Sequence, residues 1–272
     1  MAVPPKGSPC WTTRLATPPR TCCATPNSSV ARSTRSSTLS RSRHLRRYAI
    51  QRANIAERLT AGVQICGHKI GLSSPVMQQM MGVDEPDFGH LLTDMVVENG
   101  AAVDLSSLCH PRIEVEVAFV LGAALTGDCT PEDVLNATEY VCAAAELIDS
   151  RISNWRIGII DTIADNASSG KFVLGPDRVA PDAVDLATVD AALHSGFGGR
   201  DVLVTRGSTS AVLGHPANAV AWLARTLSAY DVALEAGHIV LSGSCTRAVD
   251  VAKGDHFRAE LTGLGEVFVE FI

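Results

Sequence analysis

The alternation of apolar and polar positions divides the chain into many short strands and a few helices. Apolar residues recur at helical spacing over residues 48–61 and again over 216–230. Pro75, and Thr130 followed by a proline, mark helix starts, which predicts a short helix over 75–83 and a longer helix over 131–149. Residues 151–175 form a predicted polar loop leading into a strand, and further strands are predicted at 63–74, 111–121, 189–196, 200–208, 238–246 and 265–272.

This mixture of elements predicts an α+β protein built on a curled sheet or barrel. No apolar run approaches the roughly 20 residues of a membrane-spanning helix, so we expect no membrane association. Neither a P-loop nor a G-x-G-x-x-G motif occurs in the chain. Residues 48–272 are therefore expected to form a single globular domain.

Two glutamates interrupt the otherwise apolar strand PRIEVEVAFVL at residues 111–121. Because side chains alternate between the two faces of a strand, Glu114 and Glu116 lie side by side on one face. Three explanations fit such a pair: a solvated edge strand, two carboxylates in acid–base catalysis, or oxygen ligands of a hard divalent cation. The strand pattern alone leaves all three open.

Charge divides the chain into two unlike parts. Residues 1–47 contain one Lys and eight Arg with no Asp or Glu, whereas the whole chain has a formal net charge of −6. The segment is rich in Ser, Thr and Pro and has no hydrophobic period, so we expect a disordered or aberrantly translated tail outside the fold. A transit peptide or a nucleic-acid-binding arm is the other explanation, but the sequence has neither an amphipathic Arg-bearing helix nor interleaved aromatic residues there.

The eight cysteines form no C-x-x-C pair and keep no zinc-ligand spacing with a histidine. The five cysteines beyond residue 47 lie among apolar or small residues. Reduced thiols in a cytoplasmic protein are the expected state.

Five more polar residues stand out, although each also has an ordinary structural explanation. Glu146, in AAAELID, would add a third carboxylate to the pair or would face solvent from the predicted helix. Lys69 lies among glycines, where a backbone can approach a ligand, and Asp87 follows a proline as turn aspartates do. Asn166 and Ser168 belong to DTIADNASSG, a run of small hydrogen-bonding groups that is also typical of a capping loop.

Seven segments in unbroken order beyond residue 47 carry a distinctive combination of motifs: GHKIGLSS, MMGVDEPDFGHLLTDM, PRIEVEVAFVLG, ELIDSRISNW, DTIADNASSGKFVLG, GHPANAVAWLARTL and LSGSCTRAVDVAKGDHFRAEL. Together they resemble the 2-hydroxypenta-2,4-dienoate hydratases, also called 2-keto-4-pentenoate hydratases, of the fumarylacetoacetate hydrolase superfamily. The resemblance implies the mixed β-roll of that superfamily with a small helical N-terminal region. It does not extend to residues 1–47.

The same resemblance implies a role for each candidate residue. Lys69 and Asp87 would move protons, and Ser168, with Asn166 beside it, would contact the substrate. The cofactor would be Mg²⁺ or Mn²⁺, bound by the carboxylates of Glu114, Glu116 and Glu146. A cation there would compensate the paired charges of strand 111–121.

The implied reaction is the metal-dependent addition of water to 2-hydroxypenta-2,4-dienoate, giving 4-hydroxy-2-oxopentanoate in aromatic or sterol meta-cleavage catabolism. The alternative is a 4-oxalocrotonate (2-oxo-3-hexenedioate) decarboxylase, and Asp87 in PDFG favours the hydratase because the decarboxylases tend to have an apolar residue there. We expect a homo-oligomer that acts on a small molecule and associates with other enzymes of its pathway. A silent partner subunit and a nucleic-acid-binding protein fit less well, because the metal-binding carboxylates are intact.

Overall fold

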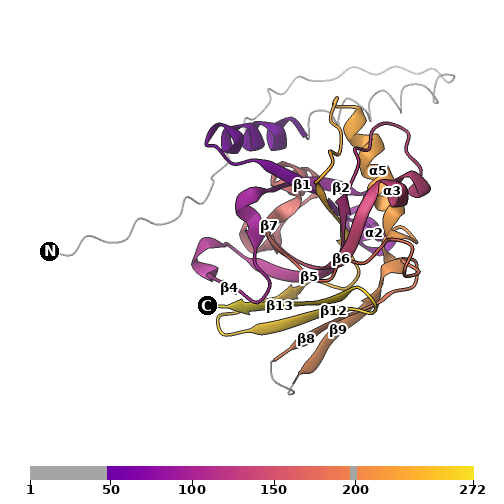
Figure 1. Ribbon diagram of the computed structural model, residues 1–272. Coiled ribbons are helices and arrows are strands. Elements are labelled where there is room, and N and C mark those ends of the chain that lie inside the picture. The colour runs from indigo at the N-terminus through magenta and orange to yellow at the C-terminus, as the bar shows by residue number, and fades with distance from the viewer. Residues whose placement is uncertain (1–47, 197–200) are drawn as a thin grey trace, which may run out of the picture.

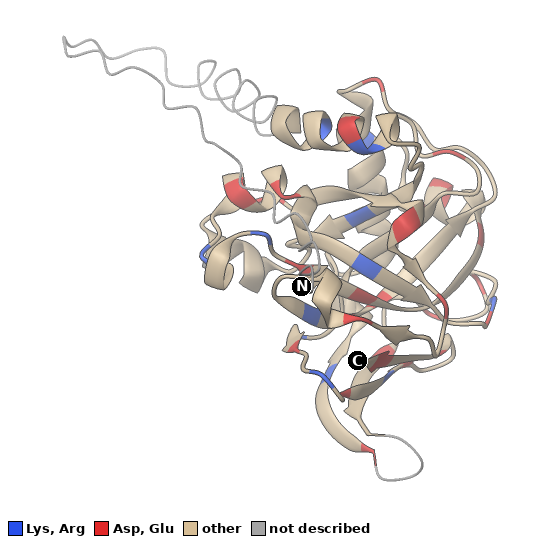
Figure 2. Cartoon of the chain, turned by 90° about the vertical axis from the view of Figure 1, so that its left-hand side faces the viewer, with Lys and Arg blue, Asp and Glu red and all other residues tan. Residues whose placement is uncertain are grey.

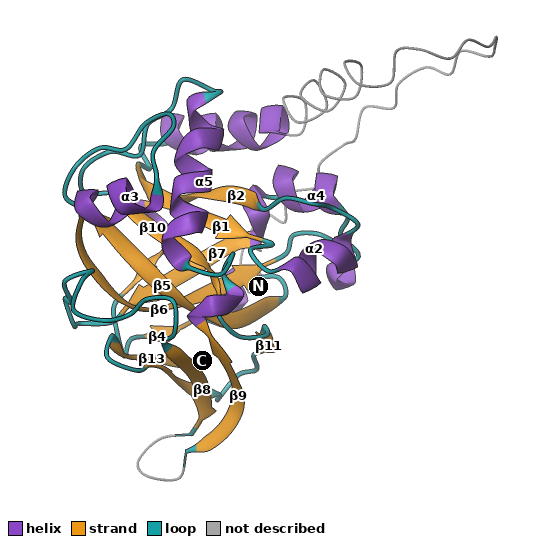
Figure 3. Cartoon of the chain, turned by 90° about the vertical axis from the view of Figure 1, so that its right-hand side faces the viewer, coloured by secondary structure: helices purple, strands orange, loops and turns teal. Residues whose placement is uncertain are grey.

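A computed structural model of the protein describes residues 48–196 and 201–272. The basic segment 1–47, predicted to be a disordered or aberrant tail, lies outside the described residues. The described chain forms two β-sheets, and most of its helices lie along the larger sheet (Figures 1 and 3). The predicted α+β architecture is confirmed.

The larger sheet has eight strands and curls into an incomplete barrel (Figure 1). Both parallel and antiparallel pairs occur in it, because β1 pairs with β10 in parallel and with β2 in antiparallel. In spatial order its strands are β2 (Asp87–Leu92), β1 (Ile65–Gly71), β10 (Ile239–Ser244), β5 (Pro111–Leu121), β6 (Thr138–Asp149), β7 (Ser169–Leu174) and β3 (Val96–Val97), with β11 (Val249–Asp250) paired to β5.

The smaller sheet packs against the outer face of β5 and β6. Val115 and Val117 of β5 belong to one buried apolar cluster with Phe257 and Val267 of the smaller sheet. Burying this face removes apolar area from water and holds β5 and β6 in place at the centre of the molecule. The strands of the smaller sheet are, in spatial order, β4 (Ala102–Val103), β13 (Gly265–Phe271), β12 (His256–Leu261), β8 (Asp190–Ser195) and β9 (Val202–Ser208).

The two helices predicted from helical spacing are confirmed, as residues 48–60 and as α5, Pro216–Ser228. The other helices are short: α2 (Pro75–Met81), α3 (Pro131–Ala137) and α4 (Ile159–Ala164), and the 3₁₀ turns η1 (Thr93–Met95), η2 (Leu105–Ser107), η3 (Ser153–Trp155), η4 (Asn166–Ser168) and η5 (Thr209–Ala211). In Figure 3, α3 and α5 lie beside one another against the larger sheet. None of the helices in the described ranges has both the length and the apolarity to cross a bilayer.

The helix predicted over residues 131–149 is wrong beyond its first two turns. Thr130 does cap a helix, through a reciprocal capping box with Asp133, but that helix ends at Ala137. The chain continues as β6, whose Ala143 and Ala145 pack toward the smaller sheet while Ala144 packs inside the barrel. Alanine favours helices in isolation, but here the segment pairs with β5 on one side and β7 on the other, and tertiary packing overrides the propensity.

The junction of β1 and β10 depends on a glycine. A Cβ at Gly67 would overlap the backbone carbonyl of Ile239, its partner in the parallel pair. We predict that Gly67→Ala lowers the free energy of unfolding by about 2–3 kcal/mol, because the two strands must move apart. Gly158→Ala, whose Cβ would meet Asp161 Oδ2 at an ordinary 3.5 Å, should cost less than about 1 kcal/mol. Urea unfolding of both variants checks this, and equal midpoints would contradict it.

Candidate metal centre

Three glutamates converge on the inner face of the barrel. Glu114 and Glu116 share one face of β5, and Glu146 stands on β6 directly opposite Glu114 in the antiparallel register. One carboxylate oxygen from each lies within 4.8 Å of the others. Strand alternation predicted the first pair, whereas Glu146 joins them from a strand and not from the predicted helix.

The surroundings of these glutamates differ from those of ordinary surface carboxylates. Acidic and basic positions are interspersed over the loops, helices and strands of the described chain (Figure 2). Only five charged side chains among the described residues are buried, and four of them belong to this site: Lys69, Asp87, Glu116 and Glu146. The solvated edge strand, one of the three explanations of the glutamate pair, is therefore wrong for Glu116.

Burial and mutual repulsion make the negative charges of this cluster costly. Burial, and then the neighbouring Glu146, raise the pKa of Glu114 to about 7. Burial also raises the pKa of Glu116 well above its usual value and that of Glu146 above its own. The backbone N–H of Gly243 donates to Glu116 Oε2 at 2.8 Å, which compensates only part of the charge.

A divalent cation fits this donor set. Neither buried oxygen of Glu146 accepts a hydrogen bond from the described residues, and its Oε1 is balanced only by an ion pair at 3.2 Å with Lys69 Nζ. Three carboxylates against one ammonium leave excess negative charge in a dry site, and carboxylate oxygens are the ligands that Mg²⁺, Mn²⁺ and Ca²⁺ prefer. The residues present can thus hold a hard divalent metal.

Lys69 extends from β1 into the same space. Its Nζ donates to the carbonyl of Ala167 at 2.9 Å as well as pairing with Glu146. Burial by itself lowers the pKa of Lys69, but the carboxylates of Glu146 and Asp87 outweigh burial and hold this pKa above its ordinary value. The lysine is therefore an ammonium at neutral pH.

Asp87 begins β2 and lies beside Lys69. A Cβ at Gly71, its cross-strand partner, would overlap Asp87 Oδ1 and would lie 3.7 Å from Lys69 Nζ. Only glycine leaves room for both groups at this position. Burial raises the pKa of Asp87, although Lys69 and a hydrogen bond with Thr162 oppose the rise, and Asp87 Oδ2 has no hydrogen-bond partner among the described residues.

The predicted capping loop forms the wall of the site next to Lys69. Asn166, Ala167 and Ser168 all have left-handed backbone conformations, with φ of 57°, 51° and 54°. The Asn166 side chain accepts from the His90 N–H at 2.7 Å and donates to the His90 carbonyl at 2.8 Å, so its amide fastens the turn to β2. Ser168 is buried, with its Oγ 3.4 Å from Asp165 Oδ2.

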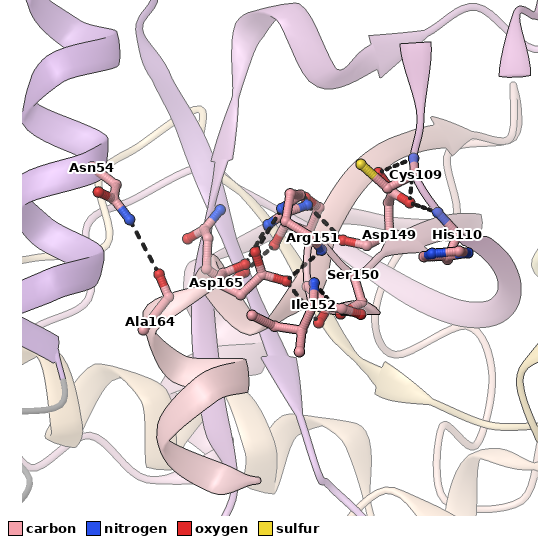
Figure 4. A network of polar contacts seen from close by, with 12 residues as sticks. Asn54, Cys109, His110, Asp149, Ser150, Arg151, Ile152, Ala164 and Asp165 are labelled. Atoms are coloured by element: carbon pink, nitrogen blue, oxygen red, sulfur yellow. Dashed lines mark hydrogen bonds and ion pairs between the residues drawn. The ribbon is translucent and has the colours of Figure 1, made fainter. Parts of the chain in front are cut away.

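The sequence motifs did not single out Arg151, which binds both ends of this turn. Its guanidinium binds Asp165 and two backbone carbonyls (Figure 4). Arg151 belongs to the family motif ELIDSRISNW. Its partner Asp165 is 14 residues further along the chain, and nothing in the local sequence pattern indicates that the two side chains meet.

The fold and the site together define a curled β-roll with a cluster of three carboxylates that can hold a divalent metal. Residues 73–271 match the fumarylacetoacetate (FAA) hydrolase C-terminal family. The chain belongs to this family, as the motifs had indicated.

Named relatives narrow the comparison. The chain is 45% identical over 225 residues to a 2-keto-4-pentenoate hydratase of Paraburkholderia xenovorans (strain LB400). This alignment covers 82% of each protein. It is 42% identical over 232 residues to a 2-oxo-hept-4-ene-1,7-dioate hydratase of Escherichia coli, covering 83% of this chain and 85% of the relative. The structure of 4-oxalocrotonate decarboxylase from Pseudomonas putida G7, complexed with magnesium and adipate, superimposes with a TM-score of 0.79 at 37% identity, covering 83% of this chain and 85% of that one.

Metal binding at this centre should be linked to proton release. Since the pKa of Glu114 is about 7 without metal, falling pH protonates a ligand that the cation needs. We predict that the affinity for Mn²⁺ is roughly tenfold weaker at pH 6 than at pH 8. Isothermal titration in two buffers of different ionisation enthalpy measures both affinity and protons released. Affinity that is independent of pH, with no proton release, would contradict the prediction.

Proposed function

We propose that the protein is a divalent-metal-dependent hydratase that adds water to 2-hydroxypenta-2,4-dienoate, giving 4-hydroxy-2-oxopentanoate. The observation that carries the proposal is the position of Lys69 and Asp87 beside the three-carboxylate centre, which combines a metal site with two proton-transfer groups. Relatives that are 42–45% identical and are named as hydratases of related oxo acids support it. The proposed place in metabolism is aromatic or sterol meta-cleavage catabolism.

Mg²⁺ or Mn²⁺ is the proposed cofactor, held by Glu114, Glu116 and Glu146. When bound, the ion supplies a Lewis acid that neutralises the substrate carboxylate and polarises the neighbouring C2 oxygen. The magnesium in the related decarboxylase structure supports a divalent metal at this fold's centre. The Gly243 N–H fixes Glu116, so the donor set is oriented before the ion arrives.

Lys69 and Asp87 are proposed to move the protons. In the first half of the reaction Asp87 accepts the enol proton and the Lys69 ammonium donates a proton to C5, which leaves an α,β-unsaturated ketone. In the second half the neutral amine takes a proton from the water that attacks C4, and protonated Asp87 delivers its proton to C3. Both groups finish in their starting states, and the substrate has gained one water.

Ser168 is the proposed substrate contact on the wall of the site. It lies next to Ala167, whose carbonyl binds Lys69, and it is buried. The neighbouring Asn166 contributes through the turn, because its amide is already engaged by the His90 backbone on both sides.

The proposal extends to the setting in which the enzyme acts. We place it in the cytoplasm as a homo-oligomer that can associate with other enzymes of its pathway. Exposed apolar side chains support an assembling surface, among them Val76 on α2 and Val202 on β9, which are 67% and 65% exposed.

The first test supplies metal-free protein, restored with Mg²⁺ or Mn²⁺, with freshly generated 2-hydroxypenta-2,4-dienoate. We expect metal-dependent loss of the dienol absorbance and a product heavier by one water. Glu114→Gln should lower kcat/KM at least about 100-fold without unfolding the protein, because the metal loses a charged ligand. Glu270→Gln, on β13 of the smaller sheet, is the matched control and should be fully active.

Two results would overturn this assignment. Near-normal activity of Glu114→Gln would contradict the metal site. Release of carbon dioxide from 2-oxo-3-hexenedioate, with no hydration of the dienoate, would make the protein a decarboxylase and show that Asp87 does not select for hydration.

Asp87 provides a separate test of proton transfer. We predict that Asp87→Asn lowers kcat by roughly 10²–10⁴-fold while Mn²⁺ affinity stays within about twofold, because the amide keeps the shape but cannot carry the proton. Asp133→Asn is the control, since it disturbs only the capping box of α3 and should cost about 1 kcal/mol of stability with kcat unchanged. Steady-state kinetics and metal titration of both variants decide the matter, and an Asp87→Asn enzyme with normal kcat would exclude the role.

A further inference from the structure

The turn at residues 165–169 is held in a conformation that the chain does not adopt readily. Three consecutive non-glycine residues, Asn166, Ala167 and Ser168, have positive φ. A left-handed conformation is unfavourable for a residue with a Cβ, and such strain persists only where the surroundings enforce it. The turn must therefore be fastened from outside.

Arg151 supplies one of these fastenings. It follows the end of β6, and its Nε donates to Asp165 Oδ1 at 2.6 Å while Nη1 donates to the carbonyls of Asp149 and Ser169 at 2.6 and 2.8 Å. Nη2 donates to the Asp165 carbonyl, and the Arg151 backbone N–H donates to Asp165 Oδ2 at 3.2 Å. The guanidinium thus grips both ends of the turn and ties them to the end of the strand that carries Glu146 (Figure 4).

The middle of the same turn contacts the proton-transfer group. The Ala167 carbonyl accepts from Lys69 Nζ at 2.9 Å. The same ammonium pairs with Glu146 Oε1 at 3.2 Å and lies in the field of Asp87. A carbonyl that shifted with a loosened turn would release Nζ toward the carboxylates. The Ala167 carbonyl of the turn therefore helps to set the position of the Lys69 ammonium.

We propose that Arg151 is a positioning residue for Lys69: by clamping the strained turn, it holds the Ala167 carbonyl where Nζ needs it for proton transfer. The inference rests on the proposed hydratase function. An arginine suits this position because its planar fork satisfies several acceptors in fixed directions, which a lysine ammonium cannot reproduce.

The test compares Arg151→Lys with a matched variant elsewhere. Arg258 is comparably buried, with 18% of its side chain exposed against 21% for Arg151, and it pairs with three carboxylates on the smaller sheet, away from the centre. Both Arg→Lys variants are assayed with Mn²⁺ and 2-hydroxypenta-2,4-dienoate for kcat, KM, Mn²⁺ affinity, melting temperature and the solvent deuterium isotope effect.

We expect Arg151→Lys to lower kcat roughly 10- to 100-fold, because a small misplacement of a catalytic group has effects of this size. KM and Mn²⁺ affinity should stay within about twofold, and the isotope effect on kcat should rise as proton transfer becomes limiting. Arg258→Lys should lose stability without losing kcat. If Arg151→Lys does not fold, Asp165→Asn, which keeps the shape of the acceptor, should show the same kinetic pattern.

The outcomes separate the two claims. A drop in melting temperature with kcat unchanged, or a rise in KM alone, would overturn the positioning role while leaving the hydratase intact. Wild-type protein that does not hydrate the dienoate would overturn the proposed function, and the inference with it.

Discussion

The register between β5 and β6 is the constraint on which the site depends. It sets Glu146 directly opposite Glu114, and strand alternation adds Glu116 on the same face. The opposite face of both strands is buried against the smaller sheet, so a shift by one residue would place the glutamates in the apolar core and the valines among the polar groups of the site. The packing of the apolar face thus maintains the carboxylate cluster, whose own electrostatics oppose it.

Compensation of that charge explains much of the surrounding structure. Lys69 approaches Glu146 from β1, and the Gly243 N–H approaches Glu116 from β10. The Asp87 carboxylate, like the glutamates, lies close to the Lys69 ammonium. Asp87 fits there only because Gly71 has no side chain. These contacts leave an excess of negative charge in a largely buried site. A divalent cation would remove this excess, and it would compete with protons for the same oxygens.

The groups that surround the carboxylate cluster and Lys69 are polar. They include backbone N–H and carbonyl groups as well as side chains. Asn166 binds the His90 peptide on β2, and Arg151 binds carbonyls at both ends of the same turn. Proton-transfer groups need such support, because a displacement of about 1 Å can lower the reaction rate roughly 100-fold. In this protein the contacts of Arg151 and Ala167 connect the end of β6, the strand that carries Glu146, to Lys69 through a strained turn.

Sequence alone identified the candidate residues and explained why some of them lie together. The period of two in strand 111–121 paired Glu114 with Glu116, the helical period found residues 48–60 and α5, and Thr130 was correctly read as a cap. The roles of Lys69, Asp87 and Glu146 came from the family motifs, since spacing gave each an equally good structural explanation. Tertiary structure decided that the alanine-rich segment after Ala137 is a strand, because its pairing with β5 and β7 outweighs helix propensity. It also decided the register that brings Glu146 to Glu114 and the grip of Arg151 on Asp165, because long-range pairing depends on how separate segments pack and leaves no periodic signal in the chain.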